Sequence, residues 1–532
     1  MGRNAAGESF LKGFLKYSAT SEYWALISNS KYESNFSNTV KEYGSSFPVN
    51  IINKHNLGKL SEPGCIYFPG PSIAELANHR GLHGSNAWSI CGITHTTSSA
   101  GAMDALSALI TAPIQPWDSI ICTSNAVKTN VTSILQANVD YLKERLGITK
   151  IVLPQLPVIP LGIDCQAFEF SAEEKAQSRK KIGALPEEIV VLFMGRLSFH
   201  AKAHPLAMYQ ALEKASQKTG KNIKLIECGW HANDFIRDSF LEAAKKACPS
   251  VKVINLDGRS HAHRQTAWAA ADIFCSLSDN IQETFGITPV EAMASGLPVV
   301  VSDWDGYKDT VRDGIDGFRV PTLMPQGGLG GDFAYRHALE IDTYDMYCGY
   351  TAMLIAVDIE ATTEGFVRLI ESPELRRKMG AAGKERAKSL YDWKVIIGRY
   401  EEHWASLNEI RISNLEVRKT LQQAWAARMD PFLSFANYPT QTLTPETRLK
   451  QSEDALETGR IQKLDYLKLK MVEFSKVLIP SDEELGIIFE QLNFDPTGVR
   501  AADLVSKIPE NRRPYALRAL VLLVKIGILK VA

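Results

Sequence analysis

Two glutamates, Glu283 and Glu291, bracket a short polar loop near the middle of the chain. An apolar run at 273–277 precedes them and predicts a buried strand, so Glu283 follows the carboxyl end of that strand. Gly286 lies between the glutamates and can adopt a positive φ, which lets backbone amides approach a ligand closely. A helix beginning at Pro289 would point its free N–H groups and positive end into the same space. These residue types therefore predict an anion site with a carboxylate on each side.

Glu291 also has a purely structural interpretation. Thr288 is a candidate N-cap, Pro289 fits the first helical position, and Glu291 stands three residues after the cap, as in a capping box. Gly296 is expected to end this helix. Glu291 can therefore be part of a cap or face a ligand. For Glu283 the alternative to a ligand contact is a solvated loop carboxylate.

Two further groups of polar residues follow predicted strands. Gly195, Arg196 and Lys202 come after the apolar run 190–193, and two cations beside a glycine could neutralise a diphosphate. Arginines and lysines in loops are, however, usually only solvated. His95 ends a central strand of the first half, where a lone histidine is more often structural than catalytic.

The elements that must position these residues alternate along the first 410 residues. Strands are expected at 24–27, 49–52, 65–68, 88–93, 119–122, 190–194, 223–227, 251–256, 273–277 and 297–301, with helices at 8–17, 73–78, 102–110, 126–146, 376–390 and 395–407. This alternation predicts parallel sheets covered on both faces. Two such halves, joined near 160–164, would face each other as doubly wound domains, and the cleft between them is the default ligand site.

Composition narrows the classes of partner. Lys+Arg total 59 and Asp+Glu total 60, so no global charge favours nucleic acid or an anionic membrane surface. The eight cysteines show no C-x-x-C pairing and are expected to be reduced core thiols, with no metal site. Neither a signal peptide nor a membrane-spanning run is evident. We therefore expect a cytoplasmic protein, with peripheral membrane contact left open.

Taken in order, these motifs resemble the family-4 (group 1) retaining glycosyltransferases, which have the GT-B fold of two Rossmann-like domains. The most specific feature is the E-x7-E spacing from Glu283 to Glu291. The other matching segments are 158–164 at the junction, Gly195-Arg196-Leu197 with a following lysine, Ser124 to Lys128, Asp316-Gly317-Phe318 and Tyr391-Asp392-Trp393. The resemblance covers about residues 5 to 410.

The resemblance implies an enzyme of hexosyltransferase type that moves a sugar from a nucleotide-diphosphate donor, with no required metal or other cofactor. Arg196 and Lys202 would bind the diphosphate, Glu291 the ribose hydroxyls, and Glu283 the transferred sugar near its anomeric carbon. His95 would lie near that sugar. The remaining donor-binding residues would be Gly195 and the backbone of Phe285, Gly286, Ile287 and Thr288. The acceptor is open (a glycan, a lipid-linked sugar or a small molecule), in surface polysaccharide or glycolipid synthesis.

On this basis we expect four parts: an acceptor-side Rossmann-like domain at 1–165, a sugar-nucleotide-binding domain at 166–395, a returning helix at 396–410, and a mainly helical appendage at 411–532. The end of the appendage is compatible with a winged-helix module or with a small helical packing domain. Its scattered Lys and Arg give no reason to expect nucleic acid.

Three segments depart from the family pattern. The usual first strand and its glycine-rich loop are missing, and Gly2 to Gly7 is a candidate remnant of that loop. The segment from Arg196 to Lys202 is one residue longer than is common, so His200 or His204 could share the lysine's role. Residues 324–360 form an insertion rich in Gly and Tyr. Two alternative interpretations of the chain stay open: a phosphorylase or synthase acting on a soluble sugar, and a degenerate transferase serving as a binding scaffold.

Overall fold

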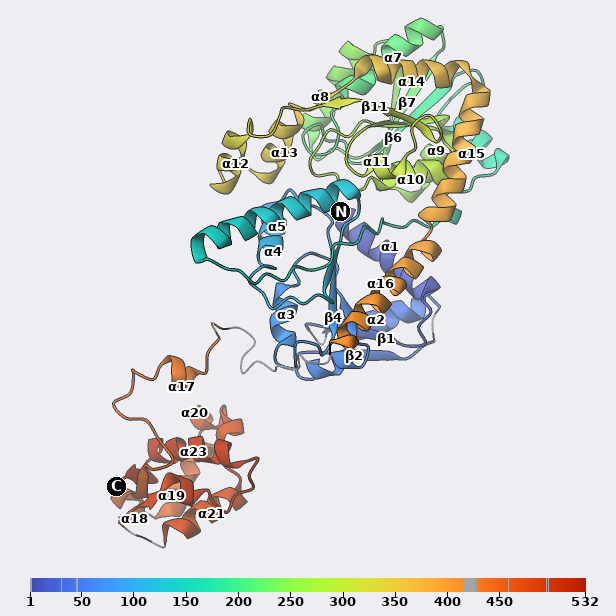
Figure 1. The fold of residues 1–532 in the computed structure, drawn as a ribbon. Coiled ribbons are helices and arrows are strands. Elements are labelled where there is room, and N and C mark those ends of the chain that lie inside the picture. Colours follow the sequence, from blue (N-terminus) through green and yellow to red (C-terminus); the bar gives the residue numbers. More distant parts are fainter. Residues whose placement is uncertain are drawn as a thin grey trace. The chain divides into compact units, whose positions relative to one another are not determined.

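The computed structural model describes residues 2–29, 31–44, 46–414, 426, 428–457, 459–493, 495 and 497–532. The chain forms two compact units, residues 1–425 and 426–532. Residues 415–425, which belong to the predicted appendage, lie outside the described residues. The first unit contains two α/β halves (Figure 1), and its residue range includes all residues proposed to do chemistry.

A parallel sheet of six strands forms the centre of the second half, in the part of the chain that the structure describes. Its strands are β6 (Ile189–Met194), β7 (Ile223–Gly229), β8 (Lys252–Asp257), β9 (Ile273–Ser276), β10 (Val299–Ser302) and β11 (Gly317–Val320). Their spatial order is β11-β10-β9-β6-β7-β8, with every neighbouring pair parallel. This is the Rossmann order, in which the direction of winding reverses between the first and fourth strands.

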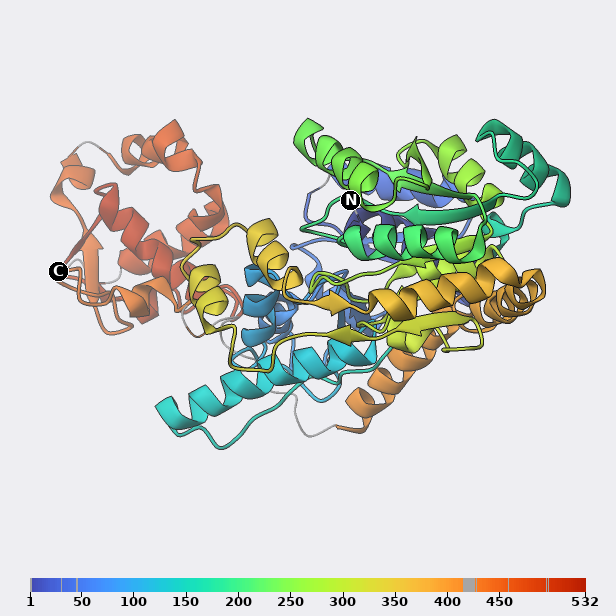
Figure 2. The ribbon, with the colours of Figure 1, turned by 90° about the horizontal axis from the view of Figure 1, so that it is seen from above.

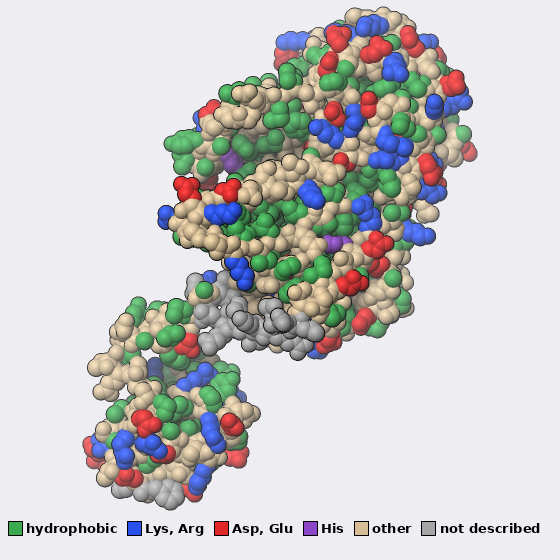
Figure 3. All heavy atoms as spheres, in the orientation of Figure 1, with side chains coloured by type: hydrophobic (Ala, Val, Ile, Leu, Met, Phe, Trp, Pro, Cys, Tyr) green, Lys and Arg blue, Asp and Glu red, His purple; other side chains and the backbone are tan. Residues whose placement is uncertain are grey.

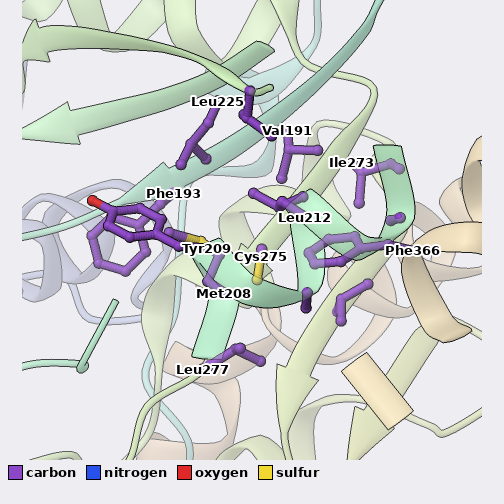
Figure 4. Packing of buried hydrophobic residues seen from close by; sticks show 14 of the residues in the cluster. Val191, Phe193, Met208, Tyr209, Leu212, Leu225, Ile273, Cys275, Leu277 and Phe366 are labelled. Carbon is purple, nitrogen blue, oxygen red and sulfur yellow. The ribbon is translucent and has the colours of Figure 1, made fainter. Parts of the chain in front are cut away.

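Helices cover both faces of this sheet, as its apolar strands require. They are α6 (Ala172–Lys181), α7 (Leu206–Thr219), α8 (Asp234–Ala247), α9 (His261–Ala270), α10 (Ile287–Ala294), α11 (Tyr307–Thr310), α14 (Ile359–Glu371) and α15 (Pro373–Leu390). Because successive strand residues point to opposite faces, Val191 packs with α7, α8 and α14 while Val190 packs with α9 and α10. Figure 4 shows the first of these layers, where Tyr209, Leu212 and Phe366 meet the strand residues.

The first half contains shorter parallel sheets. Its strands are β1 (Tyr23–Leu26), β2 (Val49–Ile52), β3 (Cys65–Tyr67), β4 (Ser89–Ile93) and β5 (Ser119–Ile121), and its helices are α1 (Gly2–Tyr17), α2 (Lys31–Glu42), α3 (Ala74–Arg80), α4 (Ala100–Ser107) and α5 (Asn125–Leu146). β1 pairs with β2, and β4 lies between β3 and β5. The Arg80 guanidinium at the end of α3 and the Asp118 carboxylate just before β5 form a fully buried ion pair, with two N–O distances of 2.5 and 2.7 Å.

One expectation for the first half is wrong. Gly2 to Gly7 was predicted to be the remnant of a glycine-rich loop, but these residues begin helix α1. Neither glycine of this segment has the positive φ that such a loop uses. Helix α1 instead packs against helix α16 (Trp393–Ser413).

The chain passes between the two halves twice, once near Ile163 and again near Tyr391, and these two segments lie side by side. Ile163 of the first crossing exchanges backbone hydrogen bonds with the second, donating to Tyr391 O at 2.9 Å and accepting from Trp393 N at 3.0 Å. Gly162 is required here, since a Cβ atom would lie 2.5 Å from the Trp393 ring. Helix α16 then returns to the first half (Figure 1), and its Arg399 Nη2 donates to Val158 O at 2.9 Å. The predicted boundary after residue 410 falls inside this helix.

The segment predicted as an insertion forms a helical hairpin. It consists of α12 (Gly331–Ala338) and α13 (Tyr344–Ala352), and it is closed at its base by the antiparallel pair β12 (Thr322–Leu323) and β13 (Ala356–Val357). Figures 1 and 2 show the hairpin projecting from the second half on the side where α4 and α5 lie. Hydrophobic side chains gather on its surface in Figure 3, and Leu329, Tyr335 and Met353 are each more than 60% exposed.

The second unit is mainly helical and has its own apolar core. Its elements are α17 (Pro431–Ser434), β14 (Arg448–Gln451), α18 (Glu453–Glu457), α19 (Arg460–Leu464), α20 (Lys470–Glu473), α21 (Asp482–Leu492), β15 (Val499–Arg500), α22 (Ala501–Leu504), α23 (Arg513–Lys525) and β16 (Leu529–Val531). Helices α21 and α23 pack on a small antiparallel sheet in the order β15-β14-β16, which the sequence did not predict. The winged-helix interpretation stays a prediction.

The expected fold class is confirmed: two Rossmann-like halves in a GT-B arrangement, followed by a helical C-terminal part. All eight cysteines are free thiols and seven of them are buried, as expected for core residues. Among the described residues, none of the helices combines the length and apolar character needed to cross a membrane.

Candidate donor site at the switch point

The candidate site lies where the winding of the six-stranded sheet reverses. β6 and β9 are neighbours, yet the connections that leave their carboxyl ends run in opposite directions. The loop after β6 carries Gly195, Arg196 and Lys202, and the loop after β9 carries Glu283 and Gly286. In open parallel sheets a ligand binds in the crevice at such a point, because the two loops diverge there. The topology therefore brings together two clusters that lie about eighty residues apart in the sequence.

Glu283 and Lys202 form the centre of this crevice. Their side chains are ion-paired and 10% and 25% exposed, respectively. The second carboxylate oxygen of Glu283 accepts hydrogen bonds from the N–H groups of Thr284 at 3.3 Å and Gly286 at 3.1 Å. Burial raises the pKa of Glu283, but Lys202 and these N–H groups outweigh it, so the net pKa lies below its usual value. Glu283 is thus an ionised carboxylate held in one orientation.

The helix after this loop begins differently from the prediction. Helix α10 starts at Ile287 with Gly286 as N-cap, and no side chain caps it. The Thr288 hydroxyl is buried without a hydrogen-bond partner among the described residues, so the predicted capping box with Glu291 is wrong. The reason is steric: Gly286 has a φ of +81°, and a Cβ atom on it would lie 1.8 Å from the Tyr307 ring. The chain can therefore turn into the helix at 286, two residues before the expected cap.

The carboxyl end of α10 agrees with the prediction. Gly296 adopts a φ of +75° directly after the helix. Its N–H donates to Met293 O at 2.9 Å, and the N–H of Leu297 donates to Ala292 O at 3.0 Å. These two bonds form a Schellman motif, which sends the chain directly into β10.

Glu291 consequently has no structural role in a cap. Its side chain is part-buried, and no hydrogen bond to its carboxylate is found within the part of the chain that the structure describes. Burial raises its pKa to about 7, while the nearby charges of Arg264 and Lys202 oppose that rise. A carboxylate that is partly desolvated but left without donors is typical of a site that a ligand completes.

Arg196 lies beside this pair and is already engaged. Its Nη2 donates to Ala201 O at 2.7 Å and to Gln282 Oε1 at 2.9 Å. Of the two histidines that could share the role of Lys202, His200 faces Asp345 of helix α13 at 3.9 Å. The backbone N–H of the other, His204, donates to the buried carboxylate of Asp279.

The first half contacts the same loop directly. The Thr284 hydroxyl donates to His95 O at 3.2 Å, and the Thr123 hydroxyl donates to Thr284 O at 3.1 Å. His95 is therefore anchored through its backbone to the residue that follows Glu283. The sheet topology of each half alone would not bring these residues together.

Asp305 is a candidate site residue that the sequence interpretation missed. It has a φ of +43°, which is strained for a residue with a side chain. Its Oδ1 accepts from the Ser124 hydroxyl at 3.1 Å, while its Oδ2 is buried without a partner among the described residues. Burial and the charge of Glu283 raise its pKa to about 7. The Asp305-Gly306 turn is the only signal in the sequence that could have indicated it.

These groups define what the crevice can bind. Arg196 and Lys202 supply positive charge, and the uncapped N-terminus of α10 supplies N–H groups, a combination of groups that binds anions such as a diphosphate. Glu283 and Glu291 flank that position and can accept hydrogen bonds from hydroxyl groups. Within the described residues, no group of three or more His, Cys, Asp or Glu side chains is arranged to hold a metal ion.

Comparison with known proteins agrees with this geometry. Residues 174–325 match the family "Glycosyl transferases group 1", a range that includes Arg196, Lys202, Glu283 and Glu291. The D-inositol 3-phosphate glycosyltransferase of Nocardia farcinica is 28% identical over 168 residues, which is 31% of this chain and 36% of that protein. The phosphatidyl-myo-inositol mannosyltransferase of Mycobacterium tuberculosis is 27% identical over 238 residues, or 45% of this chain and 50% of that protein. The chain thus spans half or less of the length of these curated relatives.

The fold is also found in a solved structure. The crystal structure of Anabaena HepE in complex with UDP covers 75% of this chain and 96% of its own, with a TM-score of 0.51 and 16% sequence identity. At that identity the likeness concerns the fold alone.

Proposed function

We propose that the protein transfers a sugar, of hexosyl type, from a nucleotide-diphosphate donor to an acceptor with retention of anomeric configuration; the match of residues 174–325 to the group 1 glycosyltransferases supports this. The observation that carries the proposal is the convergence, at one switch point, of two cations, an uncapped helix N-terminus and two carboxylates. No hydrolase with paired acid and nucleophile is implied, since Glu283 is held by Lys202 and by backbone N–H groups.

In this proposal the donor diphosphate lies between Arg196, Lys202 and the amides of Phe285 to Thr288. Lys202 exchanges its ion pair with Glu283 for the phosphate oxygens, and Glu283 then accepts hydrogen bonds from hydroxyls of the sugar. Glu291 accepts hydrogen bonds from the ribose, which supplies the donors that its carboxylate lacks in the free protein. Catalysis then consists of positioning and of stabilising negative charge on the leaving diphosphate.

The two cations also support a reaction without a required metal ion, because they can neutralise the leaving group themselves. Transfer measured with and without EDTA tests this part. Loss of transfer in EDTA, with recovery on adding Mg²⁺ or Mn²⁺, would refute it.

Donor and acceptor classes follow from the relatives. HepE binds UDP, so UDP-linked sugars are the first donors to test, followed by GDP- and ADP-linked sugars. Two relatives are named for inositol phosphate and phosphatidyl-inositol, so myo-inositol phosphates are the first acceptors, ahead of glycans and lipid-linked sugars.

The test is release of nucleoside diphosphate from this donor panel by the purified chain, with the anomeric configuration of the product read by NMR. Arg196→Ala removes a charge contact and should weaken donor affinity by about 10- to 100-fold, corresponding to ~1–3 kcal/mol. Arg237→Ala is the matched control, because Arg237 is an exposed arginine of helix α8 whose ion pairs are with Asp234 and Asp238. A folded wild-type protein that binds none of the donors would refute the proposal, and phosphate acting as the acceptor would favour a phosphorylase.

A further inference from the structure

The helical insertion α12–α13 reaches both sides of the proposed donor site. On the side of the second half, Gly349 of α13 packs so closely on the loop after β6 that a Cβ atom would lie 2.9 Å from the His200 Cβ. On the side of the first half, Tyr344 Oη is hydrogen-bonded to Ser98 Oγ at 2.8 Å and to Thr96 Oγ1 at 3.3 Å. One helix therefore contacts the loop that carries Arg196 and the loop that carries His95.

The loop at 94–98 depends on contacts at each end. At its start, the Thr94 N–H donates to Ile121 O at 2.9 Å within the first half. At residue 95 the backbone oxygen accepts from Thr284 of the second half at 3.2 Å. At its end, the Thr97 hydroxyl accepts from Asn130 Nδ2 at 2.7 Å, and the buried side chain of Ser98 has Tyr344 of the second half as a hydrogen-bond partner.

A polar connection continues from Tyr344 to the donor cations. The Gln282 side chain lies close enough to the Tyr344 hydroxyl to oppose the rise that burial causes in the pKa of Tyr344, and Gln282 Oε1 accepts from Arg196 Nη2 at 2.9 Å. A chain of polar contacts thus joins the two halves through Arg196, Gln282, Tyr344 and Ser98. Ser98 and Thr96 each lose a partner if the tyrosine hydroxyl is removed, whereas the ring can stay in place.

The hairpin is built to hold Tyr344 in this position. Asp342, which is buried, accepts two hydrogen bonds from Arg336 at 2.6 and 2.8 Å and so fixes the turn between α12 and α13. Thr343 caps α13, its hydroxyl accepting from the Met346 N–H at 3.2 Å. Tyr344 is consequently the first residue of a capped helix whose entry is fixed by an ion pair.

We propose that Tyr344 is a positioning residue for the transfer step: its hydroxyl holds the 94–98 loop, and with it His95, at the acceptor side of the donor site. The inference rests on the proposed function. Its physical basis is that a displacement of about 1 Å between reacting groups can slow a reaction by about 100-fold without weakening substrate binding.

The experiment compares wild type with Tyr344→Phe, Ser98→Ala and the double variant, and uses Tyr350→Phe as control. Tyr350 belongs to the same helix, is exposed, and contacts Phe333 within the hairpin, so its hydroxyl is not part of the connection. Turnover is measured with the first of UDP-, GDP- or ADP-linked glucose, galactose, mannose or N-acetylglucosamine that wild type uses. Hydrogen exchange of the peptide spanning 94–98 is measured on the same proteins without any substrate.

We expect Tyr344→Phe to lower the kcat of transfer by about tenfold while donor affinity stays within about twofold of wild type. The double variant should be no slower than the slower single variant, because both changes remove one interaction. Exchange at 94–98 should become faster in Tyr344→Phe and stay unchanged in Tyr350→Phe. Unchanged exchange at 94–98 or unchanged kcat in Tyr344→Phe would overturn this inference alone. A wild-type protein that binds no sugar nucleotide would overturn the proposed function and this inference with it.

Discussion

Replacing Glu291 by glutamine should stabilise the free protein and weaken donor binding. Glu291 is a part-buried carboxylate without hydrogen-bond donors among the described residues, and burial raises its pKa from 4.5 to about 7. The folded protein with Glu291 ionised is thereby destabilised by up to about 3 kcal/mol, because each unit by which the pKa is raised corresponds to about 1.36 kcal/mol. Because the side chain is only part-buried, we expect about 1–3 kcal/mol. The amide carries no charge and avoids most of this cost.

The sign of the pH dependence follows from linkage. The unfolded chain releases the Glu291 proton near pH 4.5 and the folded chain near pH 7, so the folded state binds more protons between these values. The stability of wild type therefore falls as pH rises through this window, and that of Glu291→Gln does not fall by this route. The difference between the two proteins should be small at pH 5 and reach its maximum above pH 7.

Thermal unfolding at pH 5 and pH 8 measures this difference. For a domain of this size a change of 1 kcal/mol shifts the midpoint by roughly 2–4 °C. Glu385→Gln is the control, because Glu385 is an exposed glutamate of helix α15, which packs against α10. Donor affinity of Glu291→Gln should fall by about tenfold, since an amide replaces one acceptor by a donor. A variant that is less stable than wild type at pH 8, or that binds donor equally well, would refute this reasoning.

Three other predictions test the scaffold. Arg80→Met should destabilise the first half by about 3–5 kcal/mol, because it leaves Asp118 as a buried unpaired charge, and a lowered thermal midpoint would measure this. Gly286→Ala should abolish donor binding, because the added Cβ would overlap the Tyr307 ring and force the loop before α10 to move. Titration with UDP measures this, and normal affinity would contradict the proposed position of the donor at the start of α10. A chain ending at residue 425 should retain nucleoside diphosphate release, because the first unit has its own cores; loss of activity in a folded truncated protein would make the second unit part of the catalytic apparatus.

The sequence alone determined the order and type of the elements that carry the site. Strands in both halves were predictable because fully buried parallel strands are continuous apolar runs, as at 190–194 and 273–277. The end of α10 was predictable as well, since Gly296 at positive φ is a local requirement of the chain. Because these strands were predictable, the polar clusters around Arg196 and Glu283 could also be identified, since each cluster directly follows one of them.

Only the tertiary structure decided how those clusters act together. The start of α10 depends on the Tyr307 ring behind Gly286, a contact that no local pattern encodes, and the capping-box interpretation of Glu291 therefore failed. Asp305 and Tyr344 acquire their roles from partners more than 180 residues away, Ser124 and Ser98. Local sequence specifies hydrogen bonds within a few residues, whereas the cleft is made by contacts between strand ends that only the sheet topology brings together. For that reason the anion site around Arg196 and Glu283 could be predicted from the sequence, whereas the polar connection from Arg196 to Ser98 through Tyr344 could not.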